Sequence, residues 1–189
     1  MANPLPLIVK IKRWEGGLSC DQNDRATLDP TDASVKCHTN QGIRYSTFVD
    51  WARRYSQPSS EQAFLRMSAE TWQRVFLDFF WLPMRADVIA QSHQTVAEQL
   101  VDFAWGSGPG IAARTLQTVL NARFGKYLSV DGKIGPQTIS AINSVPAEAL
   151  NDALYQARVS FLKSIVTRFP NQEVFLKGWL RRAADIAGK

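Results

Sequence analysis

A lone carboxylate followed by two glycines stands near the start of the chain, in the run W-E-G-G at positions 14–17. Ile8, Ile11 and Glu15 fall on one helical face, and glycine accepts the left-handed conformation in which helices often end. Glu15 is therefore expected in the last turn of a helix, near the negative end of the helix dipole and partly buried against Trp14. Both effects favour the protonated carboxyl group that a general acid needs. The same pattern also fits a solvated glutamate before a glycine turn.

A second polar motif, T-N-Q-G-I at positions 39–43, follows a loop rich in aspartate. Its threonine hydroxyl and asparagine amide, together with a loop carboxylate, could assist a general acid by orienting a water molecule. Aspartate is also a common turn former, so each loop carboxylate has a structural alternative. The candidate carboxylates are Asp21, Asp24, Asp29 and Asp32.

Two cysteines, Cys20 and Cys37, flank this loop. Together with His38 and His93 they show no recognisable metal-ligand spacing, so neither a metal nor another cofactor is predicted. The cysteines could close the loop as a disulfide, or they could stay reduced in a cytosolic protein. The sequence leaves both alternatives open.

Helices must position these residues, because apolar side chains recur with helical spacing along most of the chain. No segment alternates convincingly as a strand, apart from a short pair near residues 43–45. The sequence therefore predicts an all-α fold in a single compact unit. The helical stripes include Trp72, Val75, Phe76, Phe79 and Phe80; Val96, Leu100 and Phe103; Leu116, Val119 and Leu120; and Leu150, Leu154, Phe161 and Ile165.

The composition of the 189 residues argues against several classes of protein. The net charge of +5 comes from 22 Lys and Arg against 17 Asp and Glu, scattered without a nucleic-acid motif, so no nucleic-acid partner is predicted. The longest apolar run is far too short for membrane insertion. The first residues lack the basic and apolar regions of a signal peptide, so synthesis in the cytoplasm is expected.

Several motifs, in order along nearly the whole chain, resemble glycoside hydrolase family 108, whose members are lysozyme-like N-acetylmuramidases. In the first part these are E-G-G at 15–17, T-N-x-G-I at 39–43, W-L-P-M-R-A-D at 81–87 and G-S-G at 106–108. V-D-G-K-I-G-P-Q-T at 130–138 and G-W-L-R-R at 178–182 resemble the family's peptidoglycan-binding part. The resemblance implies a lysozyme-like catalytic part over residues 1–108 and a helical C-terminal part over residues 109–189, packed on the first.

The resemblance also implies an activity, namely hydrolysis of the β-1,4 bond between N-acetylmuramic acid and N-acetylglucosamine in peptidoglycan, as in endolysins. Glu15 would be the general acid, and Asp32 with Thr39 would orient the attacking water. A holin, a secretion machinery or lysis would release the enzyme to the cell wall. The alternatives are a non-catalytic peptidoglycan-binding protein and a secretion-associated regulator. The residues expected to contact the substrate are Asn40, Trp81, Arg85, Trp105 and Ser107.

The loop departs from the family's compact D-P-x-D-P-G-G-x-T pattern. D-P-T-D at 29–32 is followed by A-S-V-K-C-H before Thr39, and the usual Gly-Gly is missing. Asp32 best matches the later aspartate of the pattern, whereas Asp24 has the spacing from Glu15 that phage-type lysozymes show. Asp21 and Asp29 also remain open, so the identity of the second carboxylate is not settled by the sequence.

Overall fold

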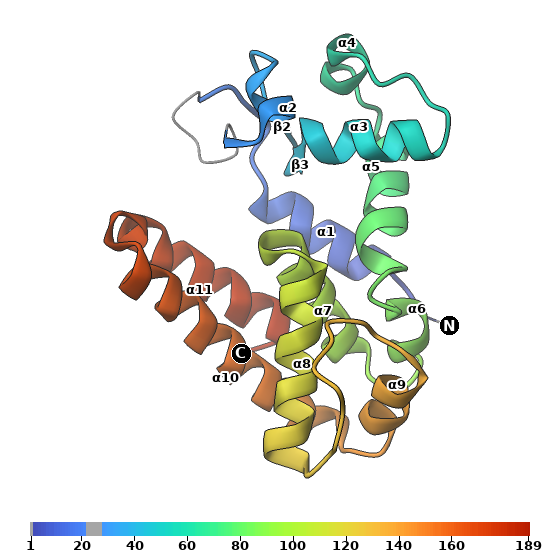
Figure 1. Ribbon diagram of the computed structural model, residues 1–189, viewed down its shortest axis with the longest axis vertical. Coiled ribbons are helices and arrows are strands. Elements are labelled where there is room, and N and C mark those ends of the chain that lie inside the picture. Colours follow the sequence, from blue (N-terminus) through green and yellow to red (C-terminus); the bar gives the residue numbers. More distant parts are fainter. Residues whose placement is uncertain (1, 22–27) are drawn as a thin grey trace. The chain divides into compact units, whose positions relative to one another are not determined.

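The computed structural model describes residues 2–21 and 28–189, and it contains two compact units in which helices predominate (Figure 1). The N-terminal unit comprises residues 8–79, and the C-terminal unit comprises residues 1–7 together with 80–189. The all-α class predicted from the sequence is confirmed. Asp24, one of the candidate carboxylates, lies outside the described residues.

A small antiparallel sheet organises the N-terminal unit. The first helix, α1 (Leu5–Trp14), leads into β1 (Leu18–Ser19). The next strand, β2 (Thr39–Asn40), pairs with β1 on one side and with β3 (Ile43–Arg44) on the other. The strand pair expected near residues 43–45 is therefore part of a three-stranded sheet. The third strand is β1, which follows shortly after Glu15.

Short helices complete this unit around an aromatic core. Ser60 and Ser68 cap two of them, since their hydroxyl oxygens accept hydrogen bonds from the backbone N–H groups of the following first turns. In the core, the rings of Trp72 and Phe76 stack with their centroids 5.6 Å apart. The helices are α2 (Pro30–Ala33), α3 (Tyr45–Arg54), α4 (Glu61–Leu65), α5 (Ala69–Phe76) and the π-helical turn η2 (Leu77–Trp81).

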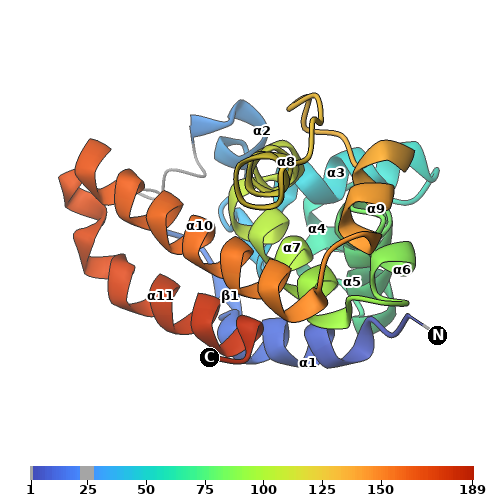
Figure 2. The ribbon, with the colours of Figure 1, turned by 90° about the horizontal axis from the view of Figure 1, so that it is seen from below.

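The C-terminal unit is built around one helix, α7, which packs against α6, α8, α10 and α11. The α10 and α11 helices form an antiparallel pair, visible in two orthogonal views (Figures 1 and 2). The helices are α6 (Ala86–Ile89), α7 (Gln94–Ser107), α8 (Pro109–Phe124), α9 (Pro136–Asn143), α10 (Ala147–Arg168), the 3-10 turn η3 (Pro170–Gln172) and α11 (Glu173–Ala187).

A buried ion-pair network ties the last two long helices to α7. Asp102 on α7 is fully buried and accepts hydrogen bonds from Arg158 Nη2 on α10, at 2.6 Å, and from Arg182 Nη2 on α11, at 2.8 Å. On the next turn of α7, Gln99 Nε2 donates to the side-chain oxygen of Asn151 at 2.9 Å. The centre of this unit is thus held by polar contacts as well as by apolar packing.

The loop between α8 and α9 is held by one buried side chain. Gln117 Nε2 donates to Asp131 Oδ1 at 2.8 Å and to the carbonyl of Lys133 at 3.0 Å, and its Oε1 accepts from the N–H of Gly132 at 2.9 Å. Gly132 has a φ of +79°, which glycine adopts without strain. The V-D-G-K-I-G-P-Q-T segment is therefore a turn fixed by Gln117, followed by a helix that begins at Pro136, since proline suits the first position of a helix.

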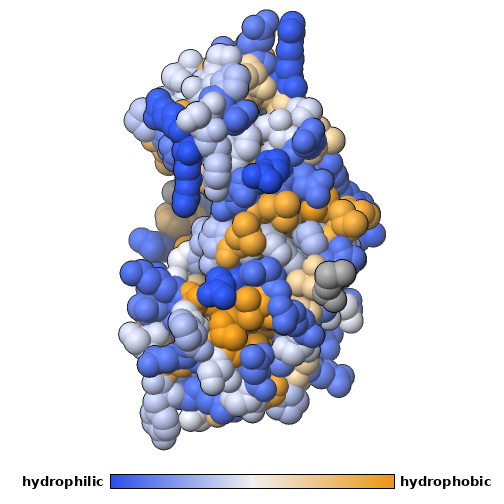
Figure 3. Space-filling model, turned by 90° about the vertical axis from the view of Figure 1, so that its right-hand side faces the viewer, coloured by the Kyte–Doolittle hydropathy of each residue, from blue (hydrophilic) through white to orange (hydrophobic). Residues whose placement is uncertain are grey.

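Several large apolar side chains remain exposed at the surface. On the face shown in Figure 3, hydrophobic residues gather in patches that hydrophilic residues surround. In the described ranges 2–21 and 28–189, no helix is long and apolar enough to cross a membrane.

Candidate active site

Glu15 follows directly after α1. Its backbone N–H donates to the carbonyl of Ile11 at 2.8 Å, so the residue completes the last helical turn, as the sequence predicted. The side chain is half-buried. Gly16 and Gly17 then release the chain from the helix and lead it into β1.

The hairpin between β2 and β3 returns to the same place. Its two turn residues, Gln41 and Gly42, have φ angles of +48° and +81°, the combination that a tight two-residue hairpin requires. A β-carbon placed on Gly42 would lie 2.6 Å from both Cδ and Oε2 of Glu15. The carboxyl group therefore lies directly against the turn, where only glycine leaves room for it.

Two hydrogen bonds hold this hairpin in position, and a third contact joins α1 to the same tryptophan. The N–H of Gln41 donates to the carbonyl of Gly17 at 3.0 Å, and the carbonyl of Gln41 accepts from Trp72 Nε1 at 2.9 Å. Lys12, on α1, lies over the ring of Trp72, 4.8 Å from its centroid. The turn and the end of α1 are thus fixed to the same aromatic side chain, which is fully buried in the core.

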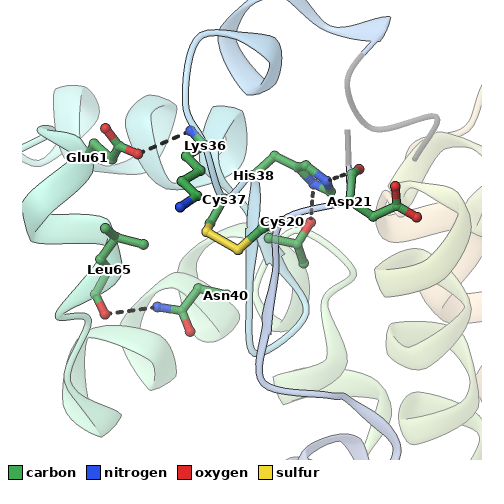
Figure 4. The surroundings of a disulfide bond; sticks show 9 residues. Cys20, Asp21, Lys36, Cys37, His38, Asn40, Glu61 and Leu65 are labelled. Atoms are coloured by element: carbon green, nitrogen blue, oxygen red, sulfur yellow. Dashed lines mark hydrogen bonds between the residues drawn. A yellow bond between two sulfur atoms is a disulfide. The ribbon is translucent and has the colours of Figure 1, made fainter. Parts of the chain in front are cut away.

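Thr39 lies on β2 beside a buried histidine. His38 Nδ1 is 3.0 Å from Thr39 Oγ1, and His38 Nε2 is 2.9 Å from the backbone carbonyl of Asp21 (Figure 4). Since the Asp21 carbonyl can only accept, His38 must donate from Nε2 and, when neutral, accept the Thr39 hydroxyl proton at Nδ1. His38 was not among the residues predicted for the site, because its role in orienting the hydroxyl depends on a contact with Asp21, at the other end of the loop.

A disulfide joins Cys20 and Cys37 next to this group (Figure 4). Of the two alternatives left open by the sequence, the structure has the bridge. It closes the aspartate-rich loop at its base, one residue from both Asp21 and His38. Both cysteines are oxidised, so a cysteine nucleophile beside His38 is excluded.

Asn40 points to the opposite side of the sheet from Thr39. It is buried, and its amide donates to the carbonyl of Phe64 at 2.7 Å. The same amide lies 3.5 Å from the carbonyl of Leu65, at the end of α4 (Figure 4). This bond fastens the hairpin to α4. A substrate-binding role for Asn40 stays a prediction, and the contacts of its amide nitrogen are structural.

Asp32, the predicted second carboxylate, is 0% exposed. Arg44 donates to it from Nε at 2.6 Å and also from Nη2, while Ser46 donates from its backbone N–H at 2.7 Å and from its hydroxyl at 3.1 Å. These bonds connect α2 with the end of β3 and the first turn of α3. A group that activates water must reach that water, so the burial and the bonding of Asp32 favour a positioning role.

The other described loop carboxylates have different surroundings. Asp29 caps α2, since its Oδ1 accepts from the N–H of Thr31 at 2.8 Å. Asp21 is exposed and lies at the end of β1, where its carbonyl meets His38. Asp21 is therefore the described loop carboxylate that combines exposure with a connection to Thr39.

The remaining predicted contacts belong to the C-terminal unit. Trp81 is 3% exposed, so its burial favours a place in the core over a sugar-stacking role. Arg85 is exposed and has a left-handed backbone with a φ of +51°. The half-buried Trp105 packs on Phe80 with ring centroids 4.6 Å apart, and Ser107 is the last residue of α7. Substrate contacts by these four residues stay predictions.

Among residues 2–21 and 28–189, no three His, Cys, Asp or Glu side chains gather as a metal site would require. What the geometry does provide is one glutamate at a helix end, enclosed by a glycine turn, with a hydroxyl on the adjoining strand. A carboxylic acid held in this way is suited to the general acid role of a glycosidase.

The comparison with protein families agrees with this class. The Glycosyl hydrolase 108 family model matches residues 8–108, and the chain therefore belongs to this family. A second model, described as a predicted peptidoglycan domain, matches residues 111–184. The protein is accordingly a glycoside hydrolase that acts on peptidoglycan.

The fold is also similar to a solved structure, that of SagA from Brucella abortus. The two sequences are 22% identical, the match covers 97% of this chain and 91% of that one, and the TM-score is 0.74. At this identity the likeness concerns the fold alone. No curated protein matches the chain.

Proposed function

We propose that the protein is an N-acetylmuramidase, which hydrolyses the β-1,4 bond between N-acetylmuramic acid and N-acetylglucosamine, with Glu15 as the general acid. The observation that carries this proposal is the contact between the Glu15 carboxyl group and the Gly42 turn. A general acid must be held at a fixed position against the leaving oxygen. The end of α1 and the hairpin together hold Glu15 in this way.

In the reaction, Glu15 donates its proton to the glycosidic oxygen as the bond to the sugar carbon breaks. A water molecule attacks that carbon from the opposite face, and its proton passes to a base. Inverting enzymes place the two carboxyl groups about 6.5–9.5 Å apart to leave room for this water. We assign the orientation of the water to Thr39, whose hydroxyl is itself oriented by His38.

As the base we assign Asp21, whose backbone carbonyl contacts the His38 ring that also contacts Thr39. To Asp32 we assign the positioning of the hairpin through Arg44. The substrate would reach the enzyme after a holin, a secretion machinery or lysis has brought the protein to the cell wall. The positive net charge of +5 would speed its encounter with the anionic wall.

The test combines product analysis with a Glu15 variant. Digested peptidoglycan is reduced with borohydride, and the new reducing ends are identified by mass spectrometry. A muramidase gives muramitol ends, whereas glucosaminitol ends would contradict the proposed bond. Glu15→Gln should lower the rate of wall lysis by at least about 10²-fold, the lower range for acid catalysis, with an unchanged Tm. The matched control is Glu70→Gln, which removes an exposed glutamate of the same unit.

A further inference from the structure

The apolar stripe of α11 continues beyond the part of the helix that is buried. Toward the C-terminus, Ala183 and Ile186 are fully buried against the rest of the unit. Trp179 and Phe175 extend the same stripe by one turn each, but Trp179 is only half-buried and Phe175 is 52% exposed. Beside Phe175, Val174 is 79% exposed. Exposed apolar groups in a contiguous set often mark a binding surface.

The two aromatic rings of this set are ordered relative to each other. Phe175 and Trp179 are stacked, with centroids 5.9 Å apart and an interplanar angle of 24°. They thus present a continuous aromatic surface at the start of α11. Pyranose rings place their flat C–H faces on such aromatic surfaces, which have an electron-rich face.

Gly178 lies next to these rings, one turn from both Val174 and Phe175. Glycine is the poorest helix former after proline, so its use within α11 needs a reason. Internal packing is not that reason, because a β-carbon on Gly178 would meet no atom of the described residues within 4 Å. A missing side chain on the outer side of a helix instead lets another molecule approach the backbone closely.

The charge around these residues has one predominant sign. The segment from Lys163 to Arg182 contains five Lys and Arg residues against a single acid, Glu173. Lys177 and Arg181 are exposed on α11 within one turn of Gly178. Lysine and arginine side chains one helical turn apart can form charge-assisted hydrogen bonds with carboxylates that recur along a ligand.

We propose that the first half of α11 is a binding surface for the glycan strand of peptidoglycan, with N-acetylhexosamine rings on Phe175 and Trp179 and lactyl or peptide carboxylates near Lys177 and Arg181. This set, Val174, Phe175, Lys177, Gly178, Trp179 and Arg181, is the α11 surface. It lies within the region matched by the predicted peptidoglycan domain. The inference rests on peptidoglycan being the ligand, but it does not depend on Glu15 being the catalytic acid.

The experiment measures binding of the full chain to purified, insoluble peptidoglycan from which teichoic acids and proteins have been removed. Every variant is made in a Glu15→Gln background so that the wall is not digested. Phe175→Ala and Trp179→Ala should each weaken binding by about tenfold, as for residues at the centre of an interface. The matched control is Tyr127→Ala, which removes a fully exposed aromatic residue from the same unit and should bind like the parent.

Gly178 provides the sharper test, because one substitution there should stabilise the protein and a larger one should abolish binding. Gly178→Ala should raise Tm, since alanine is the better helix former, and Gly178→Leu should abolish binding by obstructing the surface. A purely structural role for this residue would not combine retained stability with lost binding.

Other outcomes would overturn the assignment. Unchanged wall binding in Phe175→Ala, Trp179→Ala and Gly178→Leu would show that the glycan is held elsewhere. Binding of the parent to anionic lipid vesicles, lost in the same variants, would identify a membrane surface as the occupant. A change of oligomeric state in Phe175→Ala would identify a second copy of the chain. A parent that binds the wall but cleaves no soluble oligomer would contradict the proposed activity and leave the α11 surface intact.

Discussion

The carboxyl group of Glu15 lies against the backbone of Gly42, so closely that a β-carbon at position 42 would overlap its Cδ and Oε2. The two residues are 27 positions apart in the sequence. The E-G-G and T-N-x-G-I motifs are thus halves of one structure, in which the second half encloses the carboxyl group of the first. Gly42 must be glycine for two reasons. Its φ of +81° favours glycine, and a side chain there would overlap the Glu15 carboxyl group.

Gly42→Ala should therefore lower the rate of wall lysis by about 10²-fold or more, because Glu15 is displaced from the position that proton transfer needs. A control must separate this effect from backbone strain. Gly125→Ala serves, because Gly125 has a φ of +63° and its β-carbon would meet no described atom within 4 Å. Both variants should lose about 1–2 kcal/mol of stability from the left-handed backbone. Equal rates of lysis in the two variants would show that the Glu15 contact is unimportant.

The loop carboxylates give the second prediction. Asp32→Asn should lower the free energy of unfolding by about 1–3 kcal/mol, because a neutral amide cannot accept all the hydrogen bonds that the buried carboxylate accepts from Arg44 and Ser46. Asp21→Asn should leave Tm unchanged and lower the rate of lysis. Thermal unfolding and lysis assays on both variants, with Asp29→Asn and Asp24→Asn alongside, decide between the candidates. An Asp32→Asn protein with wild-type Tm and no activity would establish Asp32 as the catalytic carboxylate predicted from the sequence.

The residues around Glu15 show how far sequence reasoning reaches. The end of the first helix at Glu15 follows from local preferences, since an apolar stripe and two glycines are sufficient to define it. The α10 helix, Ala147–Arg168, likewise agrees with the apolar spacing predicted from Leu150 onward. By contrast, the pairing of β1 with β2 joins two-residue strands across a long loop, and such strands have no detectable alternation.

Other features depend on contacts that the sequence does not encode locally. The stripe from Trp72 to Phe80 predicts one helix, but the structure changes from α to π geometry at Leu77. The burial of Asp32 depends on Arg44 and Ser46, from the far side of the loop. An exposed aspartate in a turn and a buried aspartate in an ion pair are the same residue type. The sequence therefore could not show which of these roles Asp32 has.

The disulfide between Cys20 and Cys37 gives the third prediction. A bridge across a loop of this size stabilises the fold by roughly 3 kcal/mol, and it holds Asp21 and His38 near Thr39. Cys20→Ser with Cys37→Ser, or treatment with dithiothreitol, should lower Tm and the rate of lysis together. Thiol titration of the denatured, unreduced protein should find no free thiol. Two titratable thiols and a Tm that is insensitive to dithiothreitol would contradict a stabilising bridge.

The turn at Asp131 gives a prediction about pH. The hydrogen bond from the Gln117 side chain, followed by that from the backbone N–H of Lys133, lowers the pKa of the Asp131 carboxyl group. A carboxyl group with a lowered pKa in the folded state stabilises the protein above its unfolded pKa of about 4, and this contribution is lost as the pH falls through the folded value. Asp131→Asn should therefore reduce the loss of Tm between neutral pH and acid pH. An identical pH dependence of Tm in variant and wild type would contradict the contribution of Asp131.

The last prediction concerns the dependence of α7 on the helices that follow it. The Glycosyl hydrolase 108 match ends at Gly108, but α7, which ends at Ser107, lies at the centre of the C-terminal unit. A chain that stops at Gly108 would expose the apolar side chains of α7 and leave the buried carboxylate of Asp102 without Arg158 and Arg182. We therefore expect this fragment to be insoluble or molten, and inactive.

The full-length chain allows the same dependence to be measured without truncation. Arg158→Met should lower the free energy of unfolding by about 1.5–3 kcal/mol, because the buried Asp102 carboxylate loses one of its two arginine partners and keeps only Arg182. Arg181→Met, which removes an exposed arginine of α11, should change it by no more than about 0.5 kcal/mol. Differential scanning calorimetry of the wild type should show a single cooperative transition, which Arg158→Met shifts as a whole. A fragment of residues 1–108 that melts cooperatively and lyses cell walls would show instead that residues 109–189 are a separable wall anchor.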